Sequence, residues 1–380
     1  MDRVVSQSSA HEKDGRNRAP LGGKLARRDF PCARTNCLSS PWCRAMNLPP
    51  AVRALLWPLS LLYGVVALAR VWMYQNGWLK QKRLKATVIS VGNLTVGGTG
   101  KTPMVIWLAE KFLAAGKRVA VLSRGYRGSN GTSDEIELMK FRLQNRVAFG
   151  VGKNRFAEGQ RLEARQPVDI LLLDDGFQHL QLARDLDILL MDASCPLNGE
   201  RLLPAGRLRE PLSAMSRANV IVLTRTEAAP GAHEAIEKLS QFPVFAAATR
   251  LIGFRRYGAG IQLQPAQEIG GGPFFAFCGL GNPEAFFRDL QAWGLAICGR
   301  TVFPDHHRYT ARDLLRITQA GRNTGAEAFI TTEKDAQNLS GLKFDGAPLY
   351  ISVIEMALSP EADFRNILDR VLKEKMGAAA

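Results

Sequence analysis

The chain has 380 residues, of which 46% are hydrophobic and 22% charged, a balance typical of a globular protein rather than of a disordered or fibrous one. This length allows two domains of ordinary size, each with its own core. The formal net charge is +15, so the partners to consider are nucleic acid, an anionic membrane surface and anionic substrates.

The first part of the chain differs from the rest in composition. Residues 1–45 are rich in Ser, Arg and Asn and show little periodicity. Met46 precedes a sequence typical of a chain start, so we predict that residues 1–45 are a disordered extension or part of an overlong gene model. The following apolar run begins too late for a secretory signal peptide.

The most apolar segment is Ala54–Ala69, whose sixteen residues are fewer than the ~20 that a helix needs to span a bilayer. Four basic residues, suited to anionic head groups, follow it: Lys80, Lys82, Arg83 and Lys85. We expect residues 46–85 to form a membrane-interface helix with a basic flank, in preference to a transmembrane span or a buried core helix. A nucleic-acid site is disfavoured, because no stacking-platform motif accompanies these basic residues.

A glycine loop carries the strongest chemical signal. Residues 91–102 read VGNLTVGGTGKT and lie between an apolar run, Ala86–Val91, and an amphipathic run, Met104–Leu113. A strand, a glycine loop and a helix in this order are typical of a P-loop, where backbone N–H groups and the helix N-terminus hold a polyphosphate. A glycine turn without chemistry is the alternative, which the flanking elements disfavour.

The P-loop pattern assigns roles to its residues. We expect the phosphates of a nucleoside triphosphate to be bound by Thr95, Val96, Gly97, Gly98, Thr99, Gly100, Lys101 and Thr102. The lysine of this pattern reaches the terminal phosphates, and the threonine hydroxyl ligates Mg²⁺. The first glycine of the common pattern is Thr95 here.

Further apolar runs indicate parallel strands that are buried on both faces: Arg118–Leu122, Val168–Leu173, Leu186–Met191 and Asn219–Leu223. Helical patterns fall between them, near Arg155–Ala164 and Ala232–Leu239. We therefore predict an α/β fold, a doubly wound parallel sheet of P-loop type over residues 86–250. After a glycine-rich stretch the alternation restarts, so residues 251–380 are expected to form a second, smaller α/β domain.

Two motifs in the second part are better explained as helix caps than as nucleotide sites. In Gly279–Pro283, Asn282 suits an N-cap, and the proline suits the first helical position. Thr332, followed three residues later by Asp335, resembles a capping box more than a guanine-specificity motif.

Several polar residues are candidates for phosphoryl transfer. Asp174 and Asp175 end an apolar strand, where a carboxylate beside a P-loop can hold Mg²⁺. A transferred phosphoryl group also needs a residue that accepts or orients the acceptor's proton, and the candidates are His306 and Asp134. Three more residues are candidates for the phosphate or metal site, namely Arg155, Arg209 and Glu210.

Several separated motifs occur in one order: SVGNLTVGGTGKTP, SRGY, SDE, VGKNR, LLLDDGFQH, LLPAGRLREP, FCGLGNPEAFF, FPDHHRYT and TTEKDA. Together they resemble the tetraacyldisaccharide 4′-kinases, the lipid A 4′-kinases of Gram-negative bacteria, from about Met46 to the C-terminus. The resemblance implies an enzyme at the cytoplasmic face of the inner membrane. Such an enzyme transfers the γ-phosphate of ATP to the 4′-hydroxyl of a tetraacyldisaccharide 1-phosphate, giving lipid IVA.

The resemblance also implies roles for residues. Asp134 corresponds to the family's catalytic aspartate, paired with His306, and Tyr126 is expected to contact the lipid. The implied phosphate and metal ligands are Lys101, Thr102, Arg155, Asp174, Asp175, Arg209 and Glu210. The chain departs from the family pattern at Ser133 and Arg207.

A membrane-associated P-loop switch ATPase is the alternative function. Such proteins commonly carry a second lysine before the glycine pair, where this chain has Val96. They also tend to carry their membrane helix at the C-terminus, whereas the apolar segment here is N-terminal. Both differences favour the kinase.

Overall fold

The computed structural model describes residues 49–125, 133–195, 197, 200–229, 231–260, 262–339 and 341–377. The predicted extension and Tyr126 lie outside these ranges.

The described residues form one sheet of eleven strands in the order β3-β2-β4-β1-β5-β6-β7-β11-β10-β8-β9. The strands are β1 (Thr87–Asn93), β2 (Val119–Ser123), β3 (Ala148–Val151), β4 (Ile170–Asp174), β5 (Leu186–Asp192), β6 (Val220–Thr224), β7 (Val244–Arg256), β8 (Phe274–Cys278), β9 (Ile297–Val302), β10 (Ala328–Thr332) and β11 (Leu349–Ser359). The α-helices are α2 (Pro50–Gln75), α3 (Lys101–Ala114), α4 (Asp134–Leu143), α5 (Arg155–Arg165), α6 (Ala232–Leu239), α7 (Pro283–Ala292), α8 (Ala311–Asn323), α9 (Glu333–Asn338) and α10 (Glu361–Gly377). Short 3₁₀ helices are η4 (Leu212–Arg217) and η5 (Thr226–Ala228).

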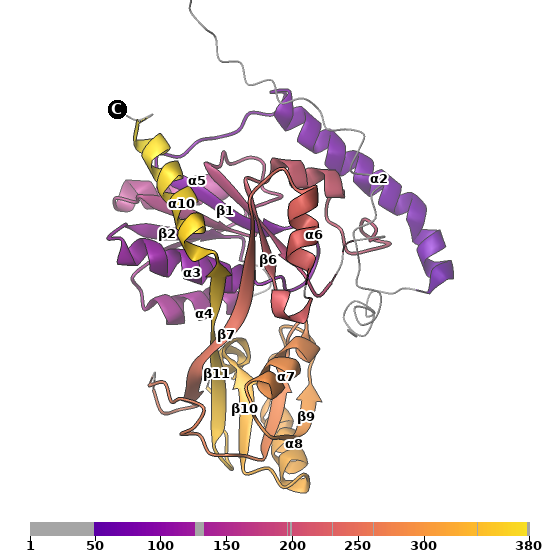
Figure 1. Cartoon of the computed structure of the whole chain (residues 1–380), viewed down its shortest axis with the longest axis vertical. Coiled ribbons are helices and arrows are strands. Elements are labelled where there is room, and N and C mark those ends of the chain that lie inside the picture. Colours follow the sequence, from indigo (N-terminus) through magenta and orange to yellow (C-terminus); the bar gives the residue numbers. More distant parts are fainter. Residues whose placement is uncertain are drawn as a thin grey trace, which may run out of the picture.

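Figure 1 shows two lobes joined by two long strands. The upper lobe holds β1–β6 with α3–α6 and α10, and the lower lobe holds β8–β10 with α7–α9. The joining strands, β7 and β11, pair antiparallel, whereas their neighbours in the sheet pair parallel. The boundary expected near residue 250 falls within β7, and α10 returns to the upper lobe, where Phe364 and Leu368 enter its core.

The upper lobe confirms the predicted doubly wound sheet. In β4 the alternate residues Ile170 and Leu172 share a core with α3, while Leu171 and Leu173 pack against Leu162 of α5 on the opposite face. Both faces of the strand are therefore buried, which is why its sequence is continuously apolar rather than alternating.

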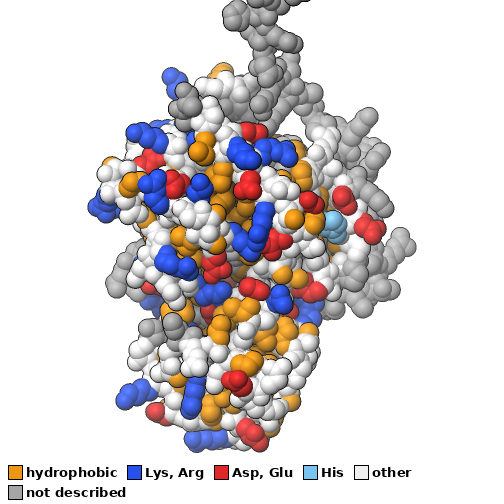
Figure 2. Space-filling view, turned by 60° about the vertical axis from the view of Figure 1, so that its left-hand side comes forward, with side chains coloured by type: hydrophobic (Ala, Val, Ile, Leu, Met, Phe, Trp, Pro, Cys, Tyr) orange, Lys and Arg blue, Asp and Glu red, His pale blue; other side chains and the backbone are white. Residues whose placement is uncertain are grey.

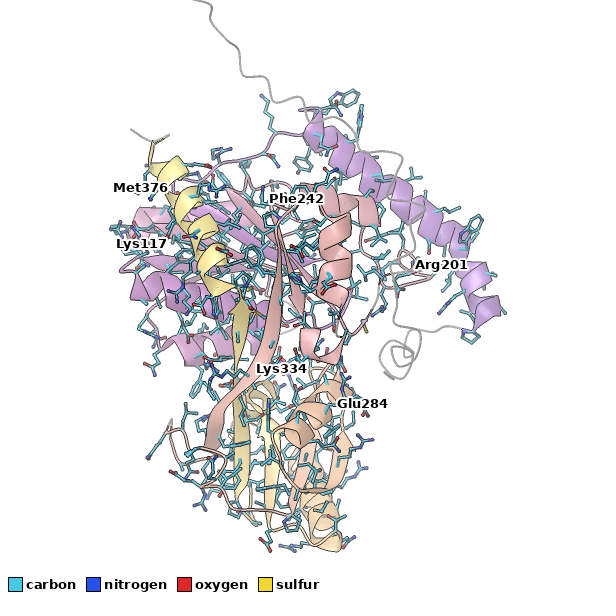
Figure 3. All side chains as sticks on the ribbon, viewed as in Figure 1. Lys117, Arg201, Phe242, Glu284, Lys334 and Met376 are labelled. Carbon is cyan, nitrogen blue, oxygen red and sulfur yellow. The ribbon has the colours of Figure 1, made fainter. Side chains whose placement is uncertain are left out.

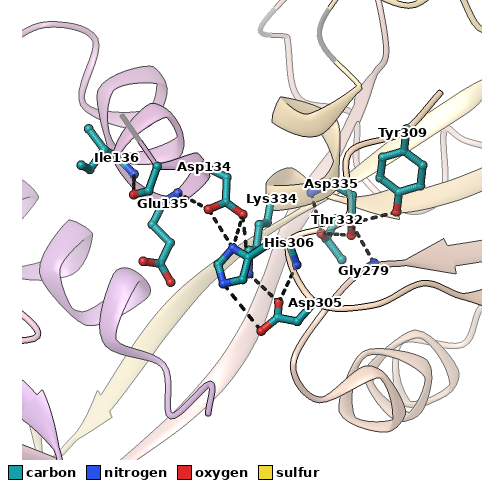
Figure 4. A network of polar contacts seen from close by, with 11 residues as sticks. Asp134, Glu135, Ile136, Gly279, Asp305, His306, Tyr309, Thr332, Lys334 and Asp335 are labelled. Atoms are coloured by element: carbon teal, nitrogen blue, oxygen red, sulfur yellow. Dashed lines mark hydrogen bonds and ion pairs between the residues drawn. The ribbon is translucent and has the colours of Figure 1, made fainter. Parts of the chain in front are cut away.

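The short helix α4, which was not predicted from the sequence, presents a candidate site residue. Its N-cap is Ser133, whose hydroxyl accepts a hydrogen bond from the backbone N–H of Ile136 at 3.4 Å. The buried stripe of the helix consists of Ile136, Met139 and Leu143. Asp134, its first residue, is held at the end of α4 that faces the lower lobe (Figure 4).

The apolar helix α2 is longer than the apolar segment that predicted it. It has 26 residues, because Arg53 and Arg70 lie within the helix rather than at its ends. At 1.5 Å per residue it extends about 39 Å, more than the ~30 Å of a bilayer's hydrocarbon core. The helix is therefore long enough to span a bilayer, contrary to the prediction from its sixteen most apolar residues. The alternative of a buried core helix is also wrong, because only 11% of its most apolar window is buried.

One stripe of α2 docks on the loop that carries Arg201 (Figure 3). The Ser60 hydroxyl donates to the Leu202 carbonyl at 3.1 Å and accepts from the backbone N–H of Ala205 at 2.9 Å. The Tyr63 hydroxyl donates to the carbonyl of Arg209 at 2.8 Å. These bonds fix the helix against a loop that ends in a candidate site residue.

Candidate functional site

A cavity of about 880 Å³ lies where the two lobes meet. The P-loop and the end of β4 line it from the upper lobe, Asp305, His306 and Lys334 from the lower lobe, and Tyr63 and Arg70 from α2. On the face that Figure 2 shows, acidic and basic side chains alternate over the upper lobe and hydrophobic side chains gather at the waist. The cavity thus joins three parts of the chain that are far apart in sequence.

The P-loop follows β1 and ends in the first turn of α3, as predicted. Gly100 is the N-cap of α3 in the left-handed region, with φ 85°, and Gly97 has φ 118°, so both positions favour glycine. Residues 96–102 line the cavity between the lobes, whereas Thr95 lines a smaller neighbouring cavity of about 210 Å³.

Lys101 is the first residue of α3, and its side chain turns back towards the ends of β1 and β4. Its Nζ donates to Oδ1 of Asn93 at 3.2 Å and lies 3.6 Å from Oδ1 of Asp175. The ammonium group is therefore held beside the helix N-terminus, where the helix dipole and the P-loop amides also favour an anion.

Asp174 and Asp175 end β4 but differ in environment. Asp174 is buried and accepts a hydrogen bond from the Ser123 hydroxyl at 3.1 Å. Burial, with the nearby carboxylates of Glu135 and Asp175, raises its pKa to about 7. For Asp175, burial alone would raise the pKa, but the cations Lys101 and Arg209 outweigh burial and lower it.

Two predicted arginines contribute to the cavity wall. Nη1 of Arg209 contacts both carboxylate oxygens of Asp175, at 2.9 and 2.8 Å. Arg155 is buried, and its Nη1 lies 3.3 Å from Nδ1 of His179. Burial, together with Arg155 and other cations, lowers the pKa of His179 to about 4, so this imidazole is neutral at pH 7.

The two proton-acceptor candidates contact each other across the lobes (Figure 4). Nδ1 of His306 lies 2.9 and 2.8 Å from the two oxygens of Asp134. The Asp134 side chain is 9% exposed and that of His306 is 50% exposed, so the imidazole is the member that faces the cavity. This hydrogen bond raises the pKa of His306, while His306 and Lys334 lower that of Asp134 against the effect of burial.

Lys334 and Asp305 complete this cluster. Nζ of Lys334 lies 2.8 Å from Oδ1 of Asp305 and 3.6 Å from Oδ2 of Asp134. Asp305 also accepts from the backbone N–H of His306 at 3.0 Å. These contacts hold His306 in a left-handed conformation, with φ 60°, that a residue with a side chain adopts only at some cost.

A buried carboxylate fixes the lower-lobe half of the cluster. Thr332 caps α9 by accepting from the backbone N–H of Asp335 at 3.1 Å, which confirms the predicted cap. Asp335 also accepts from the N–H of Gly279 at 2.8 Å and from the Tyr309 hydroxyl at 2.9 Å. The end of β8, the 305–309 loop and α9 are thereby joined at one side chain.

Glu210 does not line the cavity, unlike its chain neighbour Arg209. Glu210 is buried and forms an ion pair with Arg217 at 2.5 Å. The Arg209 side chain lines the cavity, whereas the Glu210 side chain is directed into the protein interior. The role of Glu210 as a metal ligand stays a prediction.

The site also contains Asp305 and Lys334, which were not predicted from the sequence. Both stand in recognised motifs, FPDHH and TTEKDA, where the histidines and the helix cap give the stronger local signals. Arg142 and Glu333, a buried pair joined at 2.8 Å, were not predicted either, because their 191-residue separation leaves no local signal.

Comparisons with known proteins agree with this geometry. Residues 52–373 match the family model described as tetraacyldisaccharide-1-P 4′-kinase. A tetraacyldisaccharide 4′-kinase of Geobacter metallireducens is 39% identical, covering 84% of this chain and 98% of that protein. One of Syntrophobacter fumaroxidans is 40% identical, covering 77% of this chain and 81% of that protein.

A solved structure has the same fold over most of its length. The crystal structure of LpxK from Aquifex aeolicus in complex with ATP is 32% identical, with a TM-score of 0.70. It covers 84% of this chain, and 99% of that protein is matched. The match therefore includes both lobes rather than the P-loop lobe alone.

Proposed function

This chain belongs to the tetraacyldisaccharide 4′-kinase family and is a kinase of lipid A biosynthesis, and we propose how its residues carry out the reaction. The enzyme binds ATP at the P-loop side of the cavity and transfers the γ-phosphate to the 4′-hydroxyl of a tetraacyldisaccharide 1-phosphate. The family match replaces the alternative of a P-loop switch ATPase.

The phosphate groups are held by cations of the upper lobe. Lys101 stands at the N-terminus of α3 beside the amides of the P-loop, and Arg155 and Arg209 line the same cavity. Three cations and a helix dipole around one cavity wall suit a triphosphate, whose negative charge grows on the oxygens as the phosphoryl group moves.

The residues present also fit Mg²⁺. Asp174 is a buried carboxylate whose pKa is raised to about 7, and a cation placed beside it would restore its ionised form. Mg²⁺ is usually held by one or two side chains together with substrate phosphates and water. Asp174 and Thr102 would hold the ion, which supplies neutralisation of phosphate charge.

The proton of the acceptor hydroxyl is taken by the Asp134–His306 pair acting as one unit. Asp134 holds Nδ1 of His306, so the proton would be taken by the opposite ring nitrogen, Nε2, which lies 3.7 Å from Oδ2 of Asp305. Lys334 keeps Asp134 ionised and so helps it to orient the imidazole. General-base assistance of this kind contributes about 10²–10⁴-fold to a rate.

The helix α2 brings the acceptor to this cavity. Its exposed face carries large hydrophobic side chains, among them Leu55, Leu62 and Val65, which are 77%, 62% and 63% exposed. We propose that this face lies in the inner membrane at its cytoplasmic side, where the acylated substrate is held. Tyr63 and Arg70 extend from the same helix to the cavity, so the lipid's sugar would reach the phosphate site directly.

One observation carries the proposal: a single cavity is lined by the P-loop, by His306 and by α2. Purified protein should transfer labelled γ-phosphate from ATP to a tetraacyldisaccharide 1-phosphate in detergent or vesicles. The same acceptor without its 4′-hydroxyl should remain unlabelled. Labelling of that second acceptor, or labelling of neither, would refute the proposed reaction.

A further inference from the structure

The turn that follows β4 begins at Asp175, directly after Asp174, the last residue of the strand, and its conformation is constrained. Asp175 lies in the left-handed region, with φ 50°. The next residue, Gly176, has no room for a Cβ, which would stand 2.5 Å from Oγ of Ser90. Gly92 of β1 approaches the same turn, and a Cβ there would stand 2.7 Å from the backbone nitrogen of Phe177. Such a turn keeps its shape only if its surroundings hold it.

A buried arginine, Arg184, contacts backbone carbonyls of the turn. Arg184 donates through Nη1 to the carbonyl of Gly176 at 3.2 Å, and the Phe177 carbonyl lies 3.4 Å away. Its Nε lies 3.0 Å from Oδ2 of Asp187, and the two side chains are 8% and 5% exposed. A buried guanidinium with a buried carboxylate partner can direct its remaining N–H groups at backbone carbonyls without leaving an uncompensated charge.

A second buried arginine, Arg217, contacts the backbone and the ring of Phe177 in the same turn. Arg217 donates through Nη2 to the Phe177 carbonyl at 3.3 Å, and its guanidinium carbon lies over the Phe177 ring, 4.5 Å from the ring centroid. Its carboxylate partner is Glu210, and their side chains are 11% and 6% exposed. Glu210 is also the chain neighbour of Arg209, whose guanidinium contacts Asp175 from the cavity side. The turn is therefore contacted by Arg184 and Arg217 in the interior and by Arg209 on the cavity side.

We propose that Arg184 and Arg217 are positioning residues for the metal site, which they serve by holding the turn that begins at Asp175 and so fixes Asp174 at the end of β4. Neither arginine lines the cavity, so neither contacts the substrate directly. The proposal rests on the proposed function, because it assigns the turn to Mg²⁺–ATP. It also gives Glu210 a place in the site that needs no contact with the metal.

The test measures ATP affinity by calorimetry with and without Mg²⁺, so it needs no lipid acceptor. In Arg184→Met and Arg217→Met we expect the Mg²⁺-dependent gain in ATP affinity to fall about 10–100-fold, as is usual when a residue that orients a metal ligand is lost. Affinity for ATP without Mg²⁺ should change little, because the P-loop is untouched. Thermal unfolding shows whether each variant is folded.

Two further variants keep the test decisive. Arg217→Lys retains the charge beside Glu210 but presents a single ammonium group, so it should fold even if Arg217→Met does not, and it should recover part of the Mg²⁺ dependence. Arg118→Met is the control, since Arg118 pairs with Asp169 near the opposite end of β4. It should leave both affinities unchanged.

The outcomes separate the two proposals. An unchanged Mg²⁺-dependent gain in folded Arg184 and Arg217 variants would overturn the positioning role, as would an equal loss of ATP affinity with and without Mg²⁺. If Mg²⁺ gives no gain in the unaltered protein, the metal assignment fails instead. Failure of lipid phosphorylation alone would contradict the proposed function but not this inference.

Discussion

The part of the site proposed to bind phosphate and the part proposed to accept the proton are assembled in different ways. The first consists of the P-loop, Asp174–Asp175 and Arg209, all from the upper lobe. The second joins Asp134 of α4 to His306 and Lys334 of the lower lobe. The phosphate-binding part needs no residue of the lower lobe, whereas the proton-accepting part needs the two lobes to stand in this arrangement.

The helix α4 connects the two parts. Its buried stripe, which includes Ile136, belongs to the core of the upper lobe, while Arg142 reaches the lower lobe. Nη1 of Arg142 donates to Glu333 at 2.8 Å and to the carbonyl of Ile354 at 3.1 Å. The pair thus fixes the helix that presents Asp134 against the lobe that presents its histidine partner.

The largest effect is expected in the phosphate-binding part. Lys101→Ala should lower kcat/KM for phosphorylation about a thousandfold or more, because the ammonium group proposed to contact the transferred phosphate is lost. The control is Lys117→Ala, a residue on the upper lobe that does not line the cavity (Figure 3). Steady-state kinetics with the lipid acceptor measure both, and equal rates for the two variants would remove Lys101 from the site.

The proton acceptor should show the next largest effect. His306→Ala should lower kcat about 10²–10⁴-fold, since general-base assistance disappears. ATP affinity should be unchanged, because the histidine belongs to the other part of the site. A comparable loss of ATP affinity, measured by calorimetry, would mean that the two parts are not independent.

Loss of the Arg142–Glu333 ion pair, which links α4 to the lower lobe, should lower the rate less than loss of Lys101 or His306. Arg142→Met leaves the buried carboxylate of Glu333 without the guanidinium that contacts it directly, and loss of one partner of such a pair destabilises a protein by about 3–5 kcal/mol. We expect kcat to fall about tenfold, because α4 and Asp134 shift relative to His306. Chemical unfolding and single-turnover kinetics measure the two effects.

The double variant Arg142→Met/Glu333→Gln is the control for this prediction. It removes the unpaired charge, so most of the lost stability should return, whereas the rate should stay low because the link is still absent. Full recovery of the rate would show that Arg142 contributes to stability alone.

The smallest effect concerns the membrane. Leu62→Ser on α2 should weaken binding to phospholipid vesicles about tenfold, because a side chain that is 62% exposed in water would no longer enter the lipid. Leu315→Ser is the matched control, since Leu315 is 71% exposed on α8 in the lower lobe (Figure 1). Equal vesicle binding by both variants would contradict the role of α2.

The contrast between the parts also explains what the sequence could predict. The P-loop and Asp174–Asp175 were found because strand, loop and helix are consecutive, and their geometry is set by local hydrogen bonds and by glycines with positive φ. The parallel strands could also be predicted, because a strand that is buried on both faces has a continuous apolar sequence.

Other features depend on contacts between distant segments. The pairing of His306 with Asp134 spans 172 residues, and only the family resemblance suggested it. The ion pair of Arg142 with Glu333 and the burial of Glu210 against Arg217 had no such signal. The length of α2 was underestimated because charged residues were taken as its ends, although arginine is a good helix former.

The dependence of kcat on pH tests the central claim most directly, namely that Asp134 and His306 accept the proton as a unit formed between the lobes. Asp134 raises the pKa of His306, and a base must be deprotonated to act, so the rate should rise with pH through an apparent pKa above the ordinary value of about 6.5. Asp134→Asn should move this rise to lower pH at a reduced rate, and His306→Ala should abolish it. An unchanged rise in His306→Ala would contradict the account.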